Sequence, residues 1–125
     1  MADHTVKAFD EDITRLRGII AEMGGLAEVS IQEAMQALVS GDEELARQVV
    51  ERDAKLDKLE SEVDELAVRV IALRAPMADD LREVIAALKL GGVVERIGDH
   101  ATNVAEMVHF AATGIYPPDE REDDT

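Results

Sequence analysis

The stretch "FDEDITRLRGIIAEMGGLAEVSIQEAMQAL", residues 9 to 38, decides the fold class of this chain. Its mostly apolar positions recur at alternating spacings of four and three residues, namely Phe9, Ile13, Leu16, Ile20, Met23, Ala27, Ser30, Ala34 and Leu38. This spacing matches the 3.6-residue turn of an α-helix, so these side chains share one face. The stretch therefore predicts one long amphipathic helix over residues 4 to 39.

A turn signal, "SGD", follows this stretch at residues 40 to 42. Gly41 suits the left-handed conformation that closes a helix, and Asp42 suits the capping position of the next one. A second stripe repeats the same spacing, with Arg52 as its one charged member: Leu45, Val49, Leu56, Leu59, Val63, Leu66, Val70 and Leu73. The pattern predicts a second helix over residues 42 to 74.

The segment "RAPMADD", residues 74 to 80, marks the next boundary. Pro76 suits the first position of a helix, and Asp79 and Asp80 in the first turn face the positive end of its dipole. We therefore expect a third helix over residues 76 to 113, ended by Gly114.

Two short connections make neighbouring helices antiparallel, so the predicted fold is an all-α, up-down-up three-helix bundle with helices about 50 Å long. The bundle is expected to fill one domain, residues 1 to 115. Residues 116 to 125 are rich in acids and offer almost nothing apolar to bury. They are expected to form a disordered tail.

The charge balance excludes several classes of partner. The chain has 28 acidic and 13 basic residues and a formal net charge of -15, which repels nucleic acid and anionic lipid. It has no cysteine for disulfides or thiolate metal sites, and no apolar run approaches the roughly 18 residues that cross a membrane. We expect a cytoplasmic protein without direct membrane insertion.

Five carboxylates are predicted to lie at one height of the bundle. Counting outward from the two turns places Glu28 of the first helix level with Asp53 and Asp57 of the second, and with Glu95 and Asp99 of the third. Two acids four residues apart share a helix face and repel each other by a few tenths of a kcal/mol. A bound cation would relieve this repulsion.

Oxygen ligands of this kind favour hard ions such as Mg, Mn, Ca or ferric iron. Two glycine pairs, Gly24-Gly25 and Gly91-Gly92, lie about one turn away and would let helix backbones approach each other closely. A solvated acidic face is the competing interpretation, because a chain so rich in acids contains such pairs by chance.

A second competing pattern is Glu106-x-x-His109, which has the spacing used by di-iron helical bundles and would indicate a ferritin-like protein. Neither a Ser/His/Asp arrangement nor a glycine-rich phosphate loop is present in the sequence. We therefore expect no enzymatic activity.

Two segments carry a family resemblance, "RAPMADDLREVIAALK" at residues 74 to 89 and "VVERIGDHATNVAEMV" at residues 93 to 108. They resemble the PhoU family of phosphate-transport regulators, whose hallmark is an E(D)-x-x-x-D motif on the third helix of each repeat. The family normally carries two repeats, and this chain has room for one. Residues 8 to 90 look like the start of the first repeat and residues 94 to 118 like the end of the second, as natural recombination or engineering would join them.

The resemblance implies a non-enzymatic cytoplasmic regulator that dampens phosphate-starvation signalling. Such proteins link a phosphate ABC transporter, through its ATPase subunit, to a sensor histidine kinase. The resemblance also implies iron or zinc clusters at Glu95 and Asp99, whereas Glu28, Asp53 and Asp57 come from the helix geometry alone. A homodimer would restore the missing second bundle, and a metal-free structural or interaction bundle is the alternative.

Overall fold

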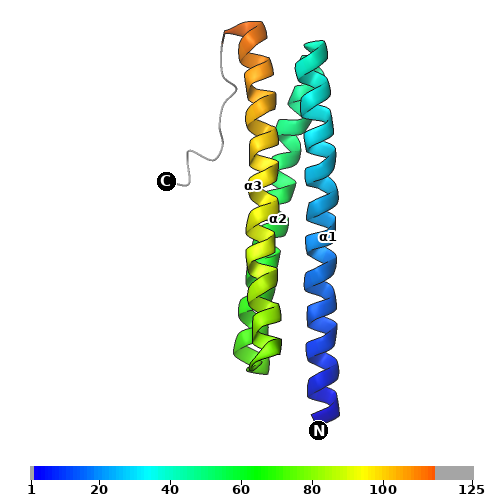
Figure 1. Ribbon diagram of the computed structural model, residues 1–125, viewed down its shortest axis with the longest axis vertical. Helices are drawn as coiled ribbons and strands as arrows, with labels where there is room; N and C mark the ends of the chain where they lie inside the picture. The colour runs from blue at the N-terminus through cyan, green and yellow to red at the C-terminus, as the bar shows by residue number, and fades with distance from the viewer. Residues whose placement is uncertain (1, 115–125) are drawn as a thin grey trace.

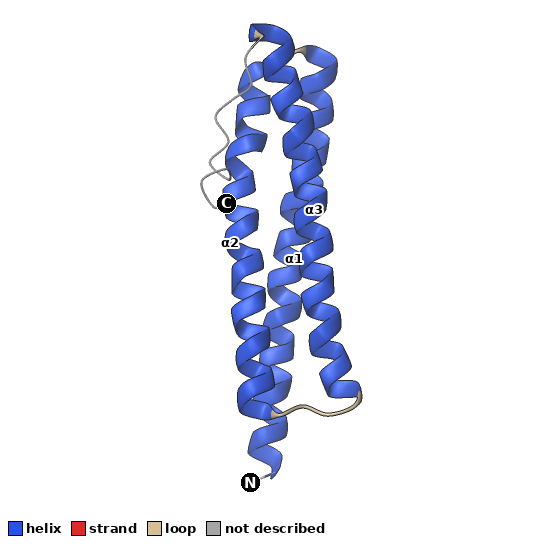
Figure 2. Ribbon diagram, turned by 90° about the vertical axis from the view of Figure 1, so that its left-hand side faces the viewer, coloured by secondary structure: helices blue, strands red, loops and turns tan. Residues whose placement is uncertain are grey.

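The computed structural model describes residues 2 to 114, which form three long helices: α1 (Ala2–Ser40), α2 (Glu43–Arg74) and α3 (Asp79–Thr113). They run up, down and up (Figure 1), and each helix packs against both of the others (Figure 2). The predicted all-α, up-down-up three-helix bundle is confirmed. The predicted tail at residues 116 to 125 lies outside the described residues.

The first turn forms as its sequence predicts. Gly41 has a φ of 70°, in the left-handed region, and its N–H donates to the Ala37 carbonyl oxygen at 2.8 Å. Asp42 caps α2, because its Oδ1 accepts a hydrogen bond from the Leu45 N–H at 3.0 Å. This two-residue connection holds α1 and α2 antiparallel.

The second turn is longer than the sequence suggested. Residues 75 to 78 connect the helices, and α3 begins at Asp79, so the prediction that Pro76 is the first residue of the third helix is wrong. A proline disfavours the right-handed helical conformation at the residue before it. Ala75 instead takes a φ of 44°, its N–H donates to the Ile71 carbonyl at 3.2 Å, and α2 ends there.

The core runs the length of the bundle and follows the predicted stripes except at their ends. Among the largest fully buried side chains are Leu16, Met23, Leu56, Val63 and Val84. The prediction that the last member of each stripe is buried is wrong, since Leu38 is 52% exposed and Leu73 is 66% exposed. A strict four-and-three spacing drifts about 20° per seven residues on a straight helix, so Ala37 replaces Leu38 in the core.

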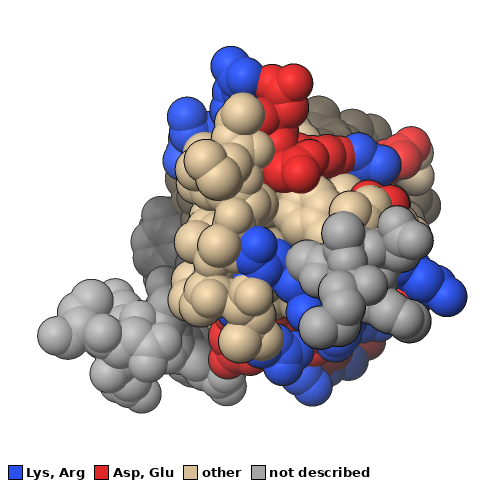
Figure 3. Space-filling model, turned by 90° about the horizontal axis from the view of Figure 1, so that it is seen from below, with Lys and Arg blue, Asp and Glu red and all other residues tan. Residues whose placement is uncertain are grey.

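Arg52, the charged residue on the α2 stripe, is held between α1 and α2. Its guanidinium donates to Glu33 Oε2 at 2.9 Å and to Ser30 Oγ at 3.3 Å. These bonds account for the buried Ser30 on the α1 stripe. At the lower end of the bundle, charged side chains of both signs surround uncharged atoms (Figure 3), and ion pairs join Arg74 to Asp12 and Arg82 to Asp79.

The glycine that permits close helix packing is Gly98. A Cβ atom there would overlap Cδ2 of Leu56, a side chain that is only 1% exposed. The expectation for the two glycine pairs is wrong at three positions, because a Cβ at Gly24, Gly25 or Gly92 meets nothing within 4 Å. At Gly91 it would lie 3.4 Å from Val63 Cγ1. The closest contact between α2 and α3 therefore lies at Gly98, about two turns beyond Gly91-Gly92.

We predict that Gly98→Ala destabilises the fold and that Gly92→Ala does not. Overpacking against Leu56 costs about 1–3 kcal/mol, and the better helix propensity of alanine offsets about 1 kcal/mol of it. Gly92 lies on the same helix with open space around it, so alanine there should stabilise by up to about 1 kcal/mol. Urea unfolding of both variants measures the difference, and equal stabilities would contradict the close contact at Gly98.

Candidate metal site

Four of the five predicted carboxylates meet between α2 and α3. One oxygen each from Asp53, Asp57 and Asp99 lies within 4.8 Å of the other two, and the same holds for Asp57, Glu60 and Glu95. The two groups share Asp57, so they form one continuous cluster. We call these five side chains, Asp53, Asp57, Glu60, Glu95 and Asp99, the acidic cluster.

Glu28 does not join them. It is exposed on α1 and belongs to neither of the two groups found among the described residues. Counting along straight helices predicted how far along the bundle Glu28 lies, but not which side of α1 it occupies. Glu28 follows the buried Ala27 and is therefore rotated about 100° away from the core.

Glu60 is the member that the sequence-based set lacked. It lies three residues after Asp57, and residues three or four apart occupy one side of a helix. The sequence therefore contained evidence for Glu60 in the run of acids along α2, but the same run is equally typical of a solvent-exposed helix face. Only the position of α3 shows which of these acids point toward Glu95 and Asp99.

The cluster is partly withdrawn from water. Asp53 is 7% exposed, and the other four side chains are half-buried. The position that a Cβ of Gly98 would take lies 4.0 Å from Asp53 Oδ1, so the α3 backbone passes close to this carboxylate. The same glycine that allows the helices to approach thus places α3 over the buried acid.

Burial and mutual repulsion both oppose ionisation of the cluster. Burial is the main cause that raises the pKa of Glu95 from 4.5 to about 9, followed by hydrogen bonds with Asp99 and Asp57 and by the charges of Asp99 and Glu60. Burial also raises the pKa of Glu60, with the charges of Asp64, Asp57 and Asp99 adding to it. The raised pKa values mean that Glu95 and Glu60 hold their protons more tightly than free carboxyls, and a cation in place of these protons would be stabilised by the same carboxylates.

The donor set fits a metal ion of a particular kind. All five side chains offer carboxylate oxygens, which suit hard ions such as Mg, Mn and iron better than they suit zinc, whose common ligands include Cys and His. His100, next to Asp99, is exposed. The geometry thus accommodates an oxygen-ligated cation, or two that share Asp57.

The Glu106-x-x-His109 pattern lies elsewhere, near the upper end of α3. His109 Nδ1 lies 3.6 Å from Glu43 Oε1 of α2, a neighbour that the sequence did not reveal. Neither Glu106 nor His109 belongs to a group of three or more candidate ligands among the described residues. The di-iron alternative therefore lacks a ligand set in this part of the chain.

None of the three described helices has a stretch that is long and apolar enough to cross a membrane.

We predict that the metal-free protein loses stability as the pH rises from about 5 to about 9. The folded state keeps a proton on Glu95 up to a pKa of about 9, whereas the unfolded chain releases it near 4.5. The folded state therefore binds more protons in this window, and its free energy of unfolding falls with pH. The loss should be about 1–2 kcal/mol, less than the full shift because water reaches the side chain.

Urea unfolding in the presence of a chelator at several pH values measures this slope. Glu95→Gln carries no titratable proton and should flatten it. A stability that rises between pH 5 and pH 8 in the parent protein would contradict the crowding of these carboxylates.

Comparison with known proteins connects this site to a family. The PhoU domain family matches residues 20 to 108. The chain is 53% identical over 105 residues to a phosphate-specific transport system accessory protein PhoU homolog of Zymomonas mobilis subsp. mobilis, covering 84% of this chain and 44% of that protein. Proteins of the same description are 43% identical over 106 residues in Caulobacter vibrioides (85% and 46%) and 41% over 113 residues in Rhizobium meliloti (90% and 48%).

The chain spans about half the length of the curated relatives it matches. The matched residues contain the second half of α1, all of α2 and α3 almost to its end, with every member of the acidic cluster. By this match and these identities, the chain belongs to the PhoU domain family.

Proposed function

We propose that this chain acts as a PhoU-type accessory regulator of phosphate transport and works through protein contacts rather than catalysis. Its relatives are named as accessory proteins of a phosphate-specific transport system. The observation that carries the proposal is the acidic cluster at Glu95 and Asp99, on the third helix of a bundle that belongs to this family.

The proposed partners are the ATPase subunit of a phosphate ABC transporter and a sensor histidine kinase, both reached from the cytoplasm. Contact with both would couple phosphate uptake to the signal that represses the starvation response. A rod of three helices, each more than thirty residues long, supports this role because it offers long lateral surfaces to different partners at once.

Metal binding is proposed for the acidic cluster. Asp53, Asp57, Glu60, Glu95 and Asp99 would hold the ions, with iron favoured by the oxygen donors and by the family resemblance. Zinc, Mg and Mn are the other ions to test. When bound, such a cation neutralises the carboxylates and links α2 to α3.

A homodimer is proposed as the assembly, because two copies would place two bundles side by side, as the two repeats of the family do. Dimerisation and metal binding are separate parts of the proposal. Each is therefore tested by its own variants.

A metal-free interaction bundle is the second candidate, and one observation favours it. Hydrogen bonds of Glu95 with Asp99 and Asp57 allow a protonated cluster to satisfy itself without an ion. The two candidates differ in what the cluster holds at neutral pH in the presence of metal.

We predict that the double variant Glu95→Gln, Asp99→Asn loses bound metal while keeping its helices. Native mass spectrometry of protein loaded with ferric iron, Mn or Zn should show at least a tenfold loss of metal-bound species, because two ligands become neutral. Glu22→Gln, Glu28→Gln is the matched control: it makes the same change in charge at two exposed acids of α1. It should bind metal like the parent.

Equal metal binding by all three proteins would overturn the proposed site, and an empty parent protein would favour the metal-free bundle.

The regulatory role needs a separate experiment. Expressed in a bacterial strain that lacks its own PhoU protein, the parent chain should lower a phosphate-starvation reporter in phosphate-rich medium. No change in the reporter would contradict the regulatory role, whatever the metal content.

A further inference from the structure

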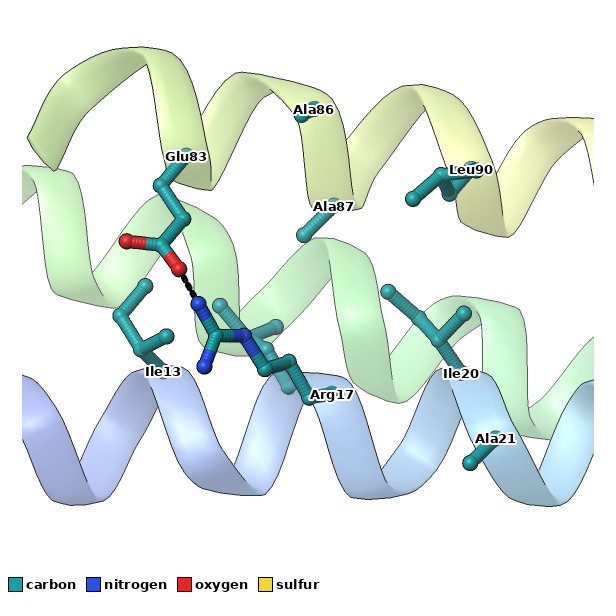
Figure 4. A pocket seen from close by; sticks show the side chains of 9 residues that line it. Ile13, Arg17, Ile20, Ala21, Glu83, Ala86, Ala87 and Leu90 are labelled. Atoms are coloured by element: carbon teal, nitrogen blue, oxygen red, sulfur yellow. Dashed lines mark ion pairs between the residues drawn. The ribbon is translucent and has the colours of Figure 1, made fainter. Parts of the chain in front are cut away.

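A groove lies between α1 and α3, lined by residues 13 to 21 of α1 and residues 83 to 90 of α3. Its cavity of about 300 Å³ is lined mostly by apolar side chains, among them Ile20, Ala21, Ala86 and Leu90. Figure 4 shows Ile20 of α1 and Leu90 of α3 in the space between the two helices, with Arg17 reaching across to Glu83. This ion pair marks the lower end of the groove.

The apolar surface continues up both helices beyond the groove. Spacings of three and four residues from Ala21 and Leu90 stay on the same helix faces. They reach Ile31, Met35 and Leu38 on α1, and Val93 and Ile97 on α3. These five side chains and Leu90 are 39% to 52% exposed, a large value for such residues in a row. We call the groove and these residues the α1–α3 face.

Few charges interrupt the α1–α3 face. Arg17 and Glu83 pair with each other, and the same spacing adds only Glu28 and His100. The acidic cluster lies on the other side of α3, against α2. In a chain with a net charge of -15, this face is the one on which two copies meet with little like-charge repulsion.

We propose that a second copy of this chain docks on the α1–α3 face, with a two-fold axis running along the groove. The inference rests on the proposed homodimer and assigns it a surface. Since α1 and α3 are parallel, this axis places α1 of one copy opposite α3 of its partner at the same height. Arg17 then meets the partner's Glu83, so the charges at the lower end are complementary.

The size of the face suits a dimer. From Arg17 to Leu38 the stripe is about 30 Å long at 1.5 Å per residue, and two helices side by side are about 20 Å wide. The contact would cover on the order of 600 Å² per copy, at the lower end of specific interfaces. The face is mostly aliphatic, with the Arg17–Glu83 pair at its lower end and Glu28 near its middle.

The test compares Val93→Glu with Val68→Glu by native mass spectrometry and sedimentation velocity. Val93 lies on the α1–α3 face and is 48% exposed, whereas Val68 lies on α2 and is 62% exposed. Both variants make the same change in side chain and charge. We expect the parent and Val68→Glu to be dimers at micromolar concentration, and Val93→Glu to dissociate at least tenfold more readily.

Two further measurements keep the proposal falsifiable. Met35→Glu tests the α1 half of the face and should act like Val93→Glu, and circular dichroism checks that both variants stay helical. Arg17→Glu tests the orientation, because it would place like charges opposite the partner's Glu83 and weaken the dimer several-fold.

A monomeric parent would overturn the dimer itself. Dimeric Val93→Glu, or equal weakening by Val68→Glu, would overturn the assignment of the face. An Arg17→Glu dimer as stable as the parent would overturn the orientation of the axis. The same mass spectra report metal content, which Val93→Glu should leave unchanged. A failed interface is thereby distinguished from a failed metal site.

Discussion

The repulsion among carboxylates that α2 and α3 hold together is the constraint on which the rest of the structure depends. Each of two groups of three carboxylates has oxygens within 4.8 Å of one another, and in a site that is partly closed to water this crowding opposes ionisation of Glu95 and Glu60. The pKa of Glu95 is raised for this reason, so Glu95 keeps its proton at neutral pH. At neutral pH the repulsion is lowered by the proton on Glu95, and a bound cation would lower it further.

The compensation comes from packing around the cluster. Gly98 lets α3 approach Leu56, and the buried aliphatic side chains above and below the cluster fix both helices in place. Arg52 bonds Ser30 and Glu33 on the α1 side of α2, away from the acids. The same arrangement separates two surfaces: a charged one between α2 and α3, and an apolar one between α1 and α3. The proposed metal binding and the proposed dimerisation can therefore be altered one at a time.

Much of this arrangement could be predicted because it repeats along the chain. Apolar spacing predicted the first two helices, boundary residues predicted the third, and Gly41 and Asp42 marked the first turn through local chemistry. Rotation about each helix was harder to predict, since small drifts accumulate over ten turns. Leu38 and Glu28 were therefore assigned to the wrong faces, and Glu60 was missed. The role of Gly98 depends on the distance between two helices, which no single-helix pattern contains.

The most direct test of the central claim, that the acidic cluster binds a cation, is an NMR titration of the metal-free protein with paramagnetic Mn²⁺ at neutral pH. Amide signals near a bound Mn²⁺ ion broaden first. We expect early loss of signals from residues 53 to 60 and 95 to 99, while signals around Glu22 and Glu28 persist. Uniform broadening over all acidic stretches, or selective loss at another group of acids, would contradict it.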